Sequence, residues 1–373
     1  MSLALRVFVV IPDGTPTAAH RTTVELLAHL PAHDVEPVVC FLGDGPLCSV
    51  CRDDEGIETI LVPIGGSAGA GAALDLVMRG ARAGLVHSVS AGAHLVAGRA
   101  ARRVGLRAVW SQFEFATLRR ARDLRAALVP ARAILTASAS AEKHQRRVNP
   151  RRIPIATITP GIRRHEASRE ERRPRARAVL GLGGDELAVG WLVGADACAE
   201  LEVALRAAAS VCHARALARL VVIRSPAEPR AAEFGEAVAS RAAALGIGSR
   251  FLFAPPHDRA APNPALCALD LAFAAPPCEV PFALEPAEAL AAGVPVVVSD
   301  VEPLRGYVDP GRDGLVVRPG DHEALAAALL SLCDAPDVRA EMELTAELEA
   351  WERFDARATA ERVAATYRKA AER

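Results

Sequence analysis

The segment CEVPFALEPAEALAAGVPVVV, residues 278–298, indicates how the chain folds more directly than any other stretch. A short polar loop leads to Pro286, and proline is favoured at the first position of a helix because its missing N–H would have no partner there. The predicted helix carries Glu288 in its first turn and ends at Gly293, and the apolar run Val294–Val298 then predicts a strand. The unpaired amides of such a helix start attract anions, and the Glu288 carboxylate can bind a pair of sugar hydroxyls. Loop, helix and strand together predict one ligand-binding edge of an α/β sheet.

Short apolar runs alternate with longer helical stretches along the whole chain. Unbroken apolar strands indicate burial on both faces, and the alternation of strand and helix indicates a parallel, doubly wound sheet. We expect seven strands in the first half, at 6–11, 37–42, 59–64, 84–87, 108–110, 133–137 and 153–157. We expect six in the second half, at 188–193, 220–223, 250–253, 269–273, 294–298 and 314–317. The sequence therefore predicts an α/β fold with two tandem Rossmann-like doubly wound parallel-sheet domains.

The boundary between the two domains is placed where the sequence becomes strongly charged. Residues 163–177 are rich in Arg, Glu and Pro and contain almost no apolar residue, which is typical of a hinge or an exposed helix. We predict an N-terminal domain at 1–162, a charged linker at 163–184, a C-terminal domain at 185–340 and C-terminal helices at 341–373. A length of 373 residues agrees with two domains, because single cores of this size are uncommon.

The charge is distributed unevenly between the halves. The net charge is −1, so nucleic acid is not an expected partner of the whole chain. Residues 1–187 nevertheless carry 26 Lys+Arg against 18 Asp+Glu, and the remainder carries 18 against 27. Two interpretations stay open: solvated helix faces and a charged linker, or a basic N-terminal half that contacts an anionic acceptor or the inner face of a membrane.

Leader, membrane and cysteine signals are weak. The first apolar run is too short for a secretory leader, and no stretch reaches the ~20 apolar residues of a membrane span. Cys48 and Cys51 form one CxxC pair, but no second pair completes a zinc site and the surrounding residues indicate a loop. We expect reduced thiols in a cytoplasmic protein.

Residues 279–297 resemble the donor-site signature of retaining glycosyltransferases of the two-domain GT-B kind, family 4 in particular. That signature has a Glu, then Gly-Phe-Gly or similar, then a second Glu eight positions after the first, within Glu-Ala-Met/Leu-Ala-x-Gly-x-Pro-Val-Val. The run Glu288–Val297 matches the second half, whereas Glu279 stands one residue early and Pro281 and Ala283 replace the two glycines. The resemblance implies that Glu288 holds the nucleotide ribose and that Glu279 has a catalytic role beside the transferred sugar.

The resemblance also implies a role for the backbone before this helix. Four residues are expected to hold the sugar or the distal phosphate through their amides: Phe282, Ala283, Leu284 and Glu285.

The predicted diphosphate position departs from the family. Gly194, after the first strand of the second domain, matches a family Gly that is followed by an Arg and, about five residues later, by a Lys. This chain has Ala195 and, near the Lys position, Glu200. Since a hydrogen bond with a charged group is worth ~1.5–3 kcal/mol, two lost contacts predict ~3–6 kcal/mol weaker binding. Arg224, after the run Leu220–Ile223, either supplies the missing charge or is an exposed loop arginine.

The first domain offers two further candidates. Gly14 follows the first strand, where the family has a Gly-rich loop that approaches the sugar phosphate and the acceptor. Gln112 lies near the place of a family His that faces the transferred sugar, and it is the second catalytic candidate although an amide cannot relay a proton. His87, at a strand end, is expected to be structural.

The resemblance implies a retaining transfer of a sugar from a nucleotide-sugar donor to an unknown glycan, lipid or small-molecule acceptor. We expect neither a cofactor nor a metal, since helix amides and cations bind the diphosphate in GT-B proteins. Two alternatives stay open: a catalytically impaired scaffold or regulatory partner, and a sugar-nucleotide epimerase of the same architecture. The account depends on the Glu288 carboxylate lining a crevice between the domains.

Overall fold

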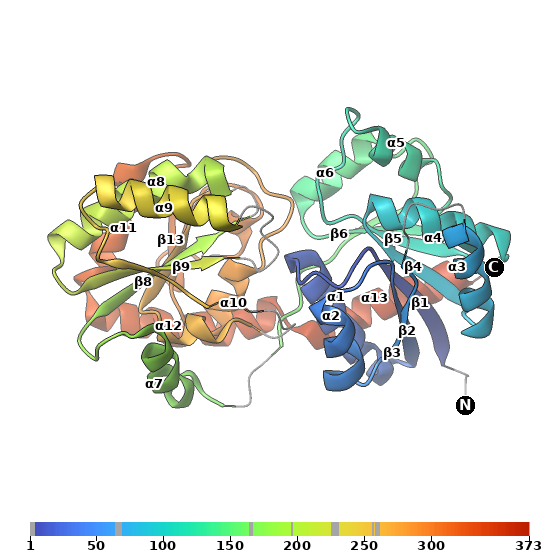
Figure 1. The fold of residues 1–373 in the computed structure, drawn as a ribbon, viewed down its shortest axis with the longest axis horizontal. Coiled ribbons are helices and arrows are strands. Elements are labelled where there is room, and N and C mark those ends of the chain that lie inside the picture. Colours follow the sequence, from blue (N-terminus) through green and yellow to red (C-terminus); the bar gives the residue numbers. More distant parts are fainter. Residues whose placement is uncertain are drawn as a thin grey trace. The chain divides into compact units, whose positions relative to one another are not determined.

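The computed structural model describes residues 4–63, 69–163, 167–194, 197–224, 231–255, 257 and 262–372. The chain divides into two compact units (Figure 1). Unit 1 comprises Met1–Gly161, Asp258–Ala261 and Asp355–Arg373, and unit 2 comprises Ile162–His257 and Pro262–Phe354. Each unit is built on its own parallel sheet, which confirms the predicted α/β fold with two doubly wound parallel-sheet domains.

The sheet of unit 1 has seven parallel strands in the order β3-β2-β1-β4-β5-β6-β7. Its strands are β1 (Leu5–Ile11), β2 (Val35–Phe41), β3 (Glu58–Leu61), β4 (Leu85–Val89), β5 (Ala108–Ser111), β6 (Ala133–Thr136) and β7 (Ile155–Thr157). Its α-helices are α1 (Ala18–His29), α2 (Pro46–Ser49), α3 (Gly69–Gly80), α4 (Ala91–Arg103), α5 (Ala121–Ala127), α6 (Ala139–Arg147) and α13 (Ala356–Ala371).

The sheet of unit 2 has six parallel strands in the order β10-β9-β8-β11-β12-β13. Its strands are β8 (Leu187–Val193), β9 (Ala218–Arg224), β10 (Phe251–Phe253), β11 (Leu271–Ala274), β12 (Val296–Ser299) and β13 (Gly314–Val317). Its α-helices are α7 (Arg169–Leu180), α8 (Ala197–Ala214), α9 (Ala231–Ala244), α10 (Glu285–Ala291), α11 (His322–Cys333) and α12 (Pro336–Arg353), and a short 3-10 turn, η3 (Pro264–Ala268), precedes β11.

Burial explains why these runs form strands. Val7–Ile11 of β1 are completely buried, as expected for a strand covered by helices on both faces. Five strands, β4, β7, β10, β11 and β12, begin one or two residues later than the apolar pattern predicts, and proline explains two of these delays. β7 begins after Pro154 and β12 begins after Pro295, because proline cannot donate a hydrogen bond to a neighbouring strand.

Hydroxyl side chains begin three of the helices in unit 1. Thr17, Ser90 and Ser138 each accept a hydrogen bond from a backbone N–H three residues on, at the starts of α1, α4 and α6. Such caps are typically worth about 1 kcal/mol each. These caps lie where the loops after β1, β4 and β6 join their helices. They therefore fix how each of these loops ends.

The charged segment after residue 163 forms α7, and its arginines bind backbone carbonyls within unit 2. Arg173 donates to Leu269 O at 3.0 Å and pairs with Asp270 at 2.6 Å, and Arg177 donates to Ala268 O at 3.1 Å. Asp270 also accepts from the Ala188 N–H at 2.7 Å, which ties α7 and the start of β11 to β8. A spacing of four residues places these arginines on one helix face.

A buried polar chain holds α13 within unit 1. The Tyr367 hydroxyl is 2.7 Å from His87 Nδ1, and His87 Nε2 is 2.6 Å from the Ser111 hydroxyl. Burial lowers the pKa of His87 to about 3, so the imidazole is neutral and each ring nitrogen has one partner. His87 is therefore a structural link between α13, β4 and β5.

We predict that Tyr367→Phe destabilises the protein by about 1–2 kcal/mol, because the buried His87 Nδ1 loses its partner. Urea unfolding followed by circular dichroism measures the change. Thr366→Val, which removes a hydroxyl from the neighbouring position of α13, is the control and should change stability by less than about 0.5 kcal/mol. Equal stability of Tyr367→Phe and the parent protein would contradict the linking role.

Candidate functional site

The topology of unit 2 marks one edge of its sheet as a candidate site. The strand order reverses between β8 and β11, and ligands of open α/β sheets bind outside the carboxyl ends of the strands at such a point. Gly194 follows β8, and the loop of residues 275–284 follows β11 and leads to α10. Arg224 pairs in register with Val193, directly before Gly194, so its backbone lies at the same edge.

The predicted segment forms the loop and helix that the sequence indicated. Glu279 is exposed in the loop, and Val280 N–H donates to Glu302 O at 3.0 Å. Phe282 and Ala283 are half-buried, and Leu284 is the N-cap residue of α10. The roles predicted for the backbone of this loop stay predictions.

Glu288 lies in the first turn of α10, as predicted, and its side chain is only 3% exposed. The helix packs against β8, β11 and β12, and the positive φ of Gly293 (69°) follows its last turn. Glu285, at the first helical position, is also buried, with 9% of its surface exposed. Buried carboxylates are retained only where hydrogen bonds or ion pairs compensate for lost hydration, and neither Glu285 nor Glu288 is without a partner.

A third buried carboxylate, Glu200, reaches the end of β8. It belongs to the first turn of α8, is 1% exposed, and accepts a hydrogen bond from the Gly194 N–H at 3.0 Å. Burial raises the pKa of Glu200 to about 7. The hydrogen bond from the Gly194 N–H partly offsets this rise in pKa, and the nearby Glu285 adds to it, whereas Glu200 Oε2 has no hydrogen-bond partner among the described residues.

Arg224 is the last residue of β9, which pairs with β8 on the side away from β11. Its guanidinium lies 4.9 Å from the centroid of the Phe253 ring, in a cation–π contact with β10. The residue is half-buried rather than fully exposed. Its predicted role, compensation for the missing diphosphate cations, stays a prediction, and Ala195 lies outside the described residues.

In unit 1, Gly14 has a clear packing reason to be glycine. A Cβ atom at this position would meet the backbone of Gly45 at 2.7 Å. Gly14 N–H donates to Gly43 O at 3.1 Å, and Gly14 O accepts from Leu47 N–H at 2.9 Å. The loop after β1 therefore lies directly on the loop after β2, and the predicted approach of a substrate to Gly14 stays a prediction.

Gln112 lies in a group of polar residues at the carboxyl edge of the unit 1 sheet. Its side chain is 1% exposed, and Nε2 donates to Glu114 O at 3.3 Å, whereas Oε1 has no hydrogen-bond partner among the described residues. His20, at the start of α1, bonds through Nδ1 to Thr15 O at 2.8 Å and lies 3.9 Å from Asp13. Burial lowers the pKa of His20, and Thr15, Asp13 and Glu114 partly offset this.

The CxxC pair is buried in unit 1. Cys48 is 4% exposed and Cys51 is fully buried, and burial raises the pKa of the Cys51 thiol to about 12. A reactive or metal-binding cysteine needs a lowered thiol pKa, so these two residues are packed as small apolar groups.

From the sequence, Glu200 was identified only as a negative charge near a position where the family has a lysine. His20 was not selected. Both act through contacts with backbone groups several residues away. A signal for Glu200 does exist: it follows Gly194 by six residues across a strand-to-helix turn, a spacing that lets a first-turn side chain reach back to the strand end. His20 has a similar spacing, since Thr15 precedes it by five residues, whereas the charge of Glu114 comes near it only in the fold.

Comparison with known proteins relates most of unit 2 to glycosyltransferases. Residues 187–335 match the family model described as "Glycosyl transferases group 1". The D-inositol 3-phosphate glycosyltransferase of Rhodococcus erythropolis (strain PR4 / NBRC 100887) is 34% identical over 201 residues, which cover 53% of this chain and 45% of that protein. The chain thus spans about half the length of the curated relatives it matches.

Solved structures match over nearly the whole chain. The structure of Anabaena Alr3699/HepE in complex with UDP and glucose matches this chain with a TM-score of 0.82 and 17% identity. The match covers 98% of this chain and 99% of that chain. The structure of WaaG, a glycosyltransferase involved in lipopolysaccharide biosynthesis, matches with a TM-score of 0.70 and 16% identity. The match covers 96% of this chain and 98% of that chain. The chain therefore has the two-domain GT-B fold, and residues 187–335, which include the segment 279–297, match the group 1 glycosyltransferase model, in agreement with the resemblance.

We predict that Glu200→Gln becomes more stable than the parent protein as the pH rises. A carboxyl group with a folded pKa near 7 stabilises the fold below its unfolded pKa, and this contribution is lost as the pH rises through 7. The glutamine has no charge to bury, so its advantage in unfolding free energy should grow by about 2 kcal/mol between about pH 5 and pH 8.

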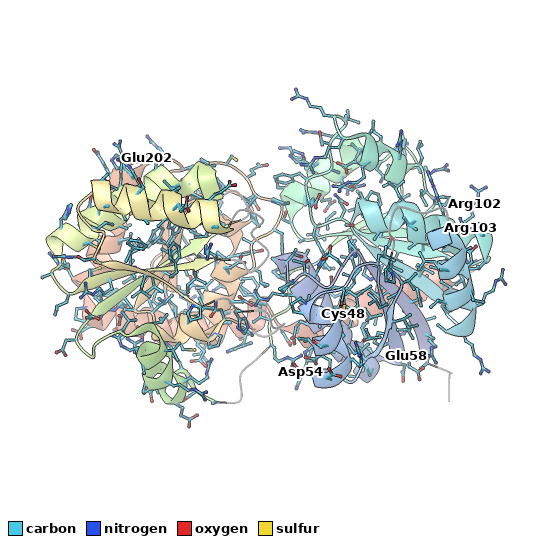
Figure 2. All side chains as sticks on the ribbon, in the orientation of Figure 1. Cys48, Asp54, Glu58, Arg102, Arg103 and Glu202 are labelled. Carbon is cyan, nitrogen blue, oxygen red and sulfur yellow. The ribbon has the colours of Figure 1, made fainter. Side chains whose placement is uncertain are left out.

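Urea unfolding at several pH values measures this advantage. The control is Glu202→Gln on the same helix, because Glu202 (Figure 2) is exposed and bonds Arg206 and Arg241, which lower its carboxyl pKa. Its stability difference from the parent should stay constant over this range. Parallel pH profiles for Glu200→Gln and the parent protein would contradict the raised pKa.

Proposed function

We propose that this chain transfers a sugar from a nucleotide-sugar donor to an acceptor hydroxyl, with retention of the anomeric configuration. The observation that supports this most is the edge of unit 2 where Gly194 and the α10 segment with Glu288 follow the two strands of the switch point. That edge lies in the part of the chain that matches the group 1 glycosyltransferases. Two of the solved neighbours are described as complexes with UDP and glucose or with UDP-glucose.

The proposed reaction breaks the bond between the anomeric carbon and the diphosphate oxygen and forms a bond from that carbon to the acceptor oxygen on the same face. The acceptor proton passes to the departing diphosphate, so the products are the glycoside and a nucleoside diphosphate. Glu288 accepts hydrogen bonds from the ribose hydroxyls, and Arg224 supplies positive charge at the end of β9. Glu279 and Gln112 contact the transferred sugar, and the loop at Gly14 serves the acceptor.

The enzyme proposal is favoured over a scaffold because the relatives are described as glycosyltransferases. A thermal-shift panel of nucleoside diphosphates separates the two functions. A rise in melting temperature with at least one nucleotide is expected for the enzyme, whereas a flat response across the panel would favour the scaffold.

We predict that Glu288→Ala and Glu288→Gln weaken UDP-glucose binding about 10- to 100-fold, because hydrogen bonds to a charged group are worth ~1.5–3 kcal/mol. Isothermal titration calorimetry at about pH 6 measures the dissociation constant. Glu323→Gln is the matched control, since Glu323 lies in the first turn of α11 but is exposed. Unchanged binding by both Glu288 variants would contradict the ribose role.

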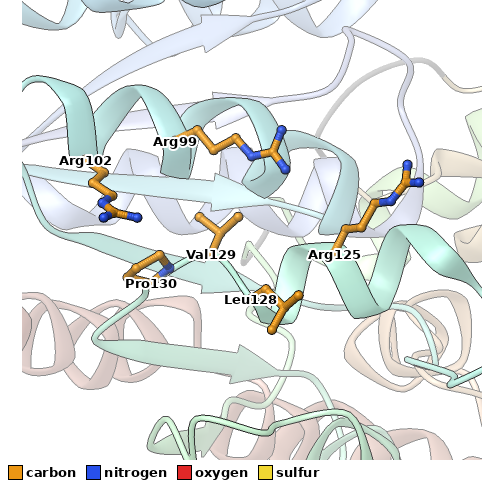
Figure 3. Close-up of a pocket in the computed structure, with 6 residues that line it drawn as sticks. All are labelled: Arg99, Arg102, Arg125, Leu128, Val129 and Pro130. Atoms are coloured by element: carbon orange, nitrogen blue, oxygen red, sulfur yellow. The ribbon is translucent and has the colours of Figure 1, made fainter.

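We also propose that unit 1 contacts anionic membrane lipids, as one interpretation of its basic sequence allows. Arg99 and Arg102 of α4 and Arg125 of α5 line a hollow of about 160 Å³ with the apolar residues Leu128, Val129 and Pro130 (Figure 3). None of the three guanidiniums forms an ion pair with a described residue, and all three side chains are exposed. Basic groups beside exposed leucines are typical of surfaces that bind lipid headgroups.

The leucines support this interpretation. Leu118, Leu124 and Leu128, on and around α5, are 60%, 39% and 58% exposed. No helix in the described part of the chain has the length and apolar character needed to cross a bilayer. The proposed contact is therefore with the membrane surface.

We predict that replacing Arg99, Arg102 and Arg125 together by Ala reduces binding to vesicles of phosphatidylcholine and phosphatidylglycerol about 100-fold, since each basic residue near such a surface contributes about 1 kcal/mol. Co-sedimentation measures the bound fraction. A second triple variant, with Ala at the exposed Arg79, Arg147 and Arg151, has the same charge change outside the hollow and should bind much better. Equal losses in the two variants would contradict a specific surface.

A further inference from the structure

The start of α1 (Figure 1) holds His20 in one orientation. Thr17 Oγ1 accepts a hydrogen bond from the His20 N–H at 3.1 Å, and His20 Nδ1 lies 2.8 Å from Thr15 O. The Thr15 N–H in turn donates to Asp13 Oδ1 at 2.8 Å, so the imidazole is tied to the loop after β1. A carbonyl oxygen can only accept, so Nδ1 of the neutral ring carries the hydrogen and Nε2 carries the lone pair.

The lone pair of His20 Nε2 is able to accept a hydrogen bond from a ligand. Nε2 has no hydrogen-bond partner among the described residues. Although His20 is only 7% exposed, Nε2 is not among the buried atoms that lack a partner, so this nitrogen keeps contact with solvent. Burial lowers the pKa of His20, which keeps the imidazole neutral at about pH 7.5. His20 therefore offers an acceptor atom, rather than a positive charge, at the carboxyl edge of the unit 1 sheet.

A second acceptor atom at this edge also lacks a donor. Gln112 follows β5, is 1% exposed, and donates from Nε2 to Glu114 O at 3.3 Å. That bond fixes the orientation of the amide, so the atom without a partner among the described residues is the carbonyl oxygen Oε1. Since nearly all buried polar atoms of folded proteins have a partner, Gln112 Oε1 is a candidate contact for a donor group of a ligand.

The charges around His20 disfavour an anionic group. Asp13 lies 3.9 Å from Nδ1, and the charge of Glu114 also acts on the ring. Both residues are acidic, and among the described residues that act on the His20 ring there is no cation. Arg120 and Arg122 bond Glu114 instead. Two unpaired acceptor atoms beside acidic groups require a ligand that brings hydroxyl donors and no negative charge.

We infer that His20 binds the acceptor of the proposed transfer through a hydrogen bond from an acceptor hydroxyl to Nε2. The inference rests on the proposed function, because it concerns the molecule that receives the sugar. In that reaction the attacking hydroxyl gives its proton to the departing diphosphate, so the hydroxyl bound by His20 is a second one. The acceptor is therefore a neutral polyol, such as a sugar or a cyclitol, and His20 is an acceptor-binding residue beside the loop at Gly14.

Two amide variants separate this role from a purely structural one. In His20→Asn the amide nitrogen can replace Nδ1 as the donor to Thr15 O, but no atom reaches the position of Nε2. In His20→Gln the longer side chain places an amide oxygen near that position and gives up the bond to Thr15. The KM for the polyol should therefore rise about five- to tenfold in His20→Asn, with kcat little changed. It should stay within about twofold of the parent value in His20→Gln, whereas a structural role predicts the opposite order.

Release of UDP from UDP-glucose by the 373-residue chain at about pH 7.5 measures these constants, with glycerol, myo-inositol and D-glucose as the polyol probes. Isothermal titration calorimetry should give the same dissociation constant for UDP-glucose in the parent protein and both variants. Circular dichroism melting confirms that the variants are folded. His213→Asn, at an exposed histidine of α8 in unit 2, is the remote control and should leave all constants unchanged.

Equal KM values for the parent protein and His20→Asn, or a larger rise in His20→Gln than in His20→Asn, would overturn this inference and leave the proposed function standing. Binding of UDP-glucose without any acceleration of UDP release by the three polyols would do the same. Absence of UDP-glucose binding by the parent protein and both variants would overturn the proposed function and this inference together.

Discussion

Parallel strands can be joined only by crossovers, and this constraint places every loop that follows a strand at one edge of its sheet. In unit 2 the crossovers diverge between β8 and β11, so the turn after Val193 and the loop after Ala274 become neighbours although about eighty residues separate them in the sequence. The parallel pairing of β11 with β8, in which Phe273 lies opposite Trp191, records this meeting directly. The position of the candidate site follows from topology before any side chain is considered.

The charge of the side chains at that edge is unusual. Helix starts and strand ends offer amides that attract anions, yet three buried carboxylates, Glu200, Glu285 and Glu288, are gathered around them. Burial of an ionised carboxylate costs free energy that only hydrogen bonds or protonation can offset. Carboxylates suit the hydroxyl groups of a ribose or a sugar, whereas a diphosphate needs positive or neutral surroundings.

The strands were predictable because buried parallel strands are apolar throughout, and their ends were less so. Pro154 and Pro295 delay β7 and β12 because they lack an N–H. The predicted strand 269–273 begins only at Leu271, after Asp270, whose carboxylate bonds Ala188 N–H and Arg173. The arginines of the charged segment could have been predicted to share a helix face from their spacing of four. Their partners could not, since backbone carbonyls leave no mark in a sequence.

The site was predictable only where it matched a motif. Glu288 and the helix around it were identified from residues 278–298, whereas the contacts of Glu200 with Gly194 and of His20 with Thr15 belong to no motif that the sequence analysis used.

The most direct test of the account is a crystal structure of the chain grown with UDP-glucose at about pH 6. We expect the ribose hydroxyls within hydrogen-bond distance of the Glu288 carboxylate and the diphosphate beside Gly194 at the start of α8. A nucleotide bound elsewhere, with the Glu288 carboxylate and the turn after β8 untouched, would contradict the assignment of this edge as the donor site.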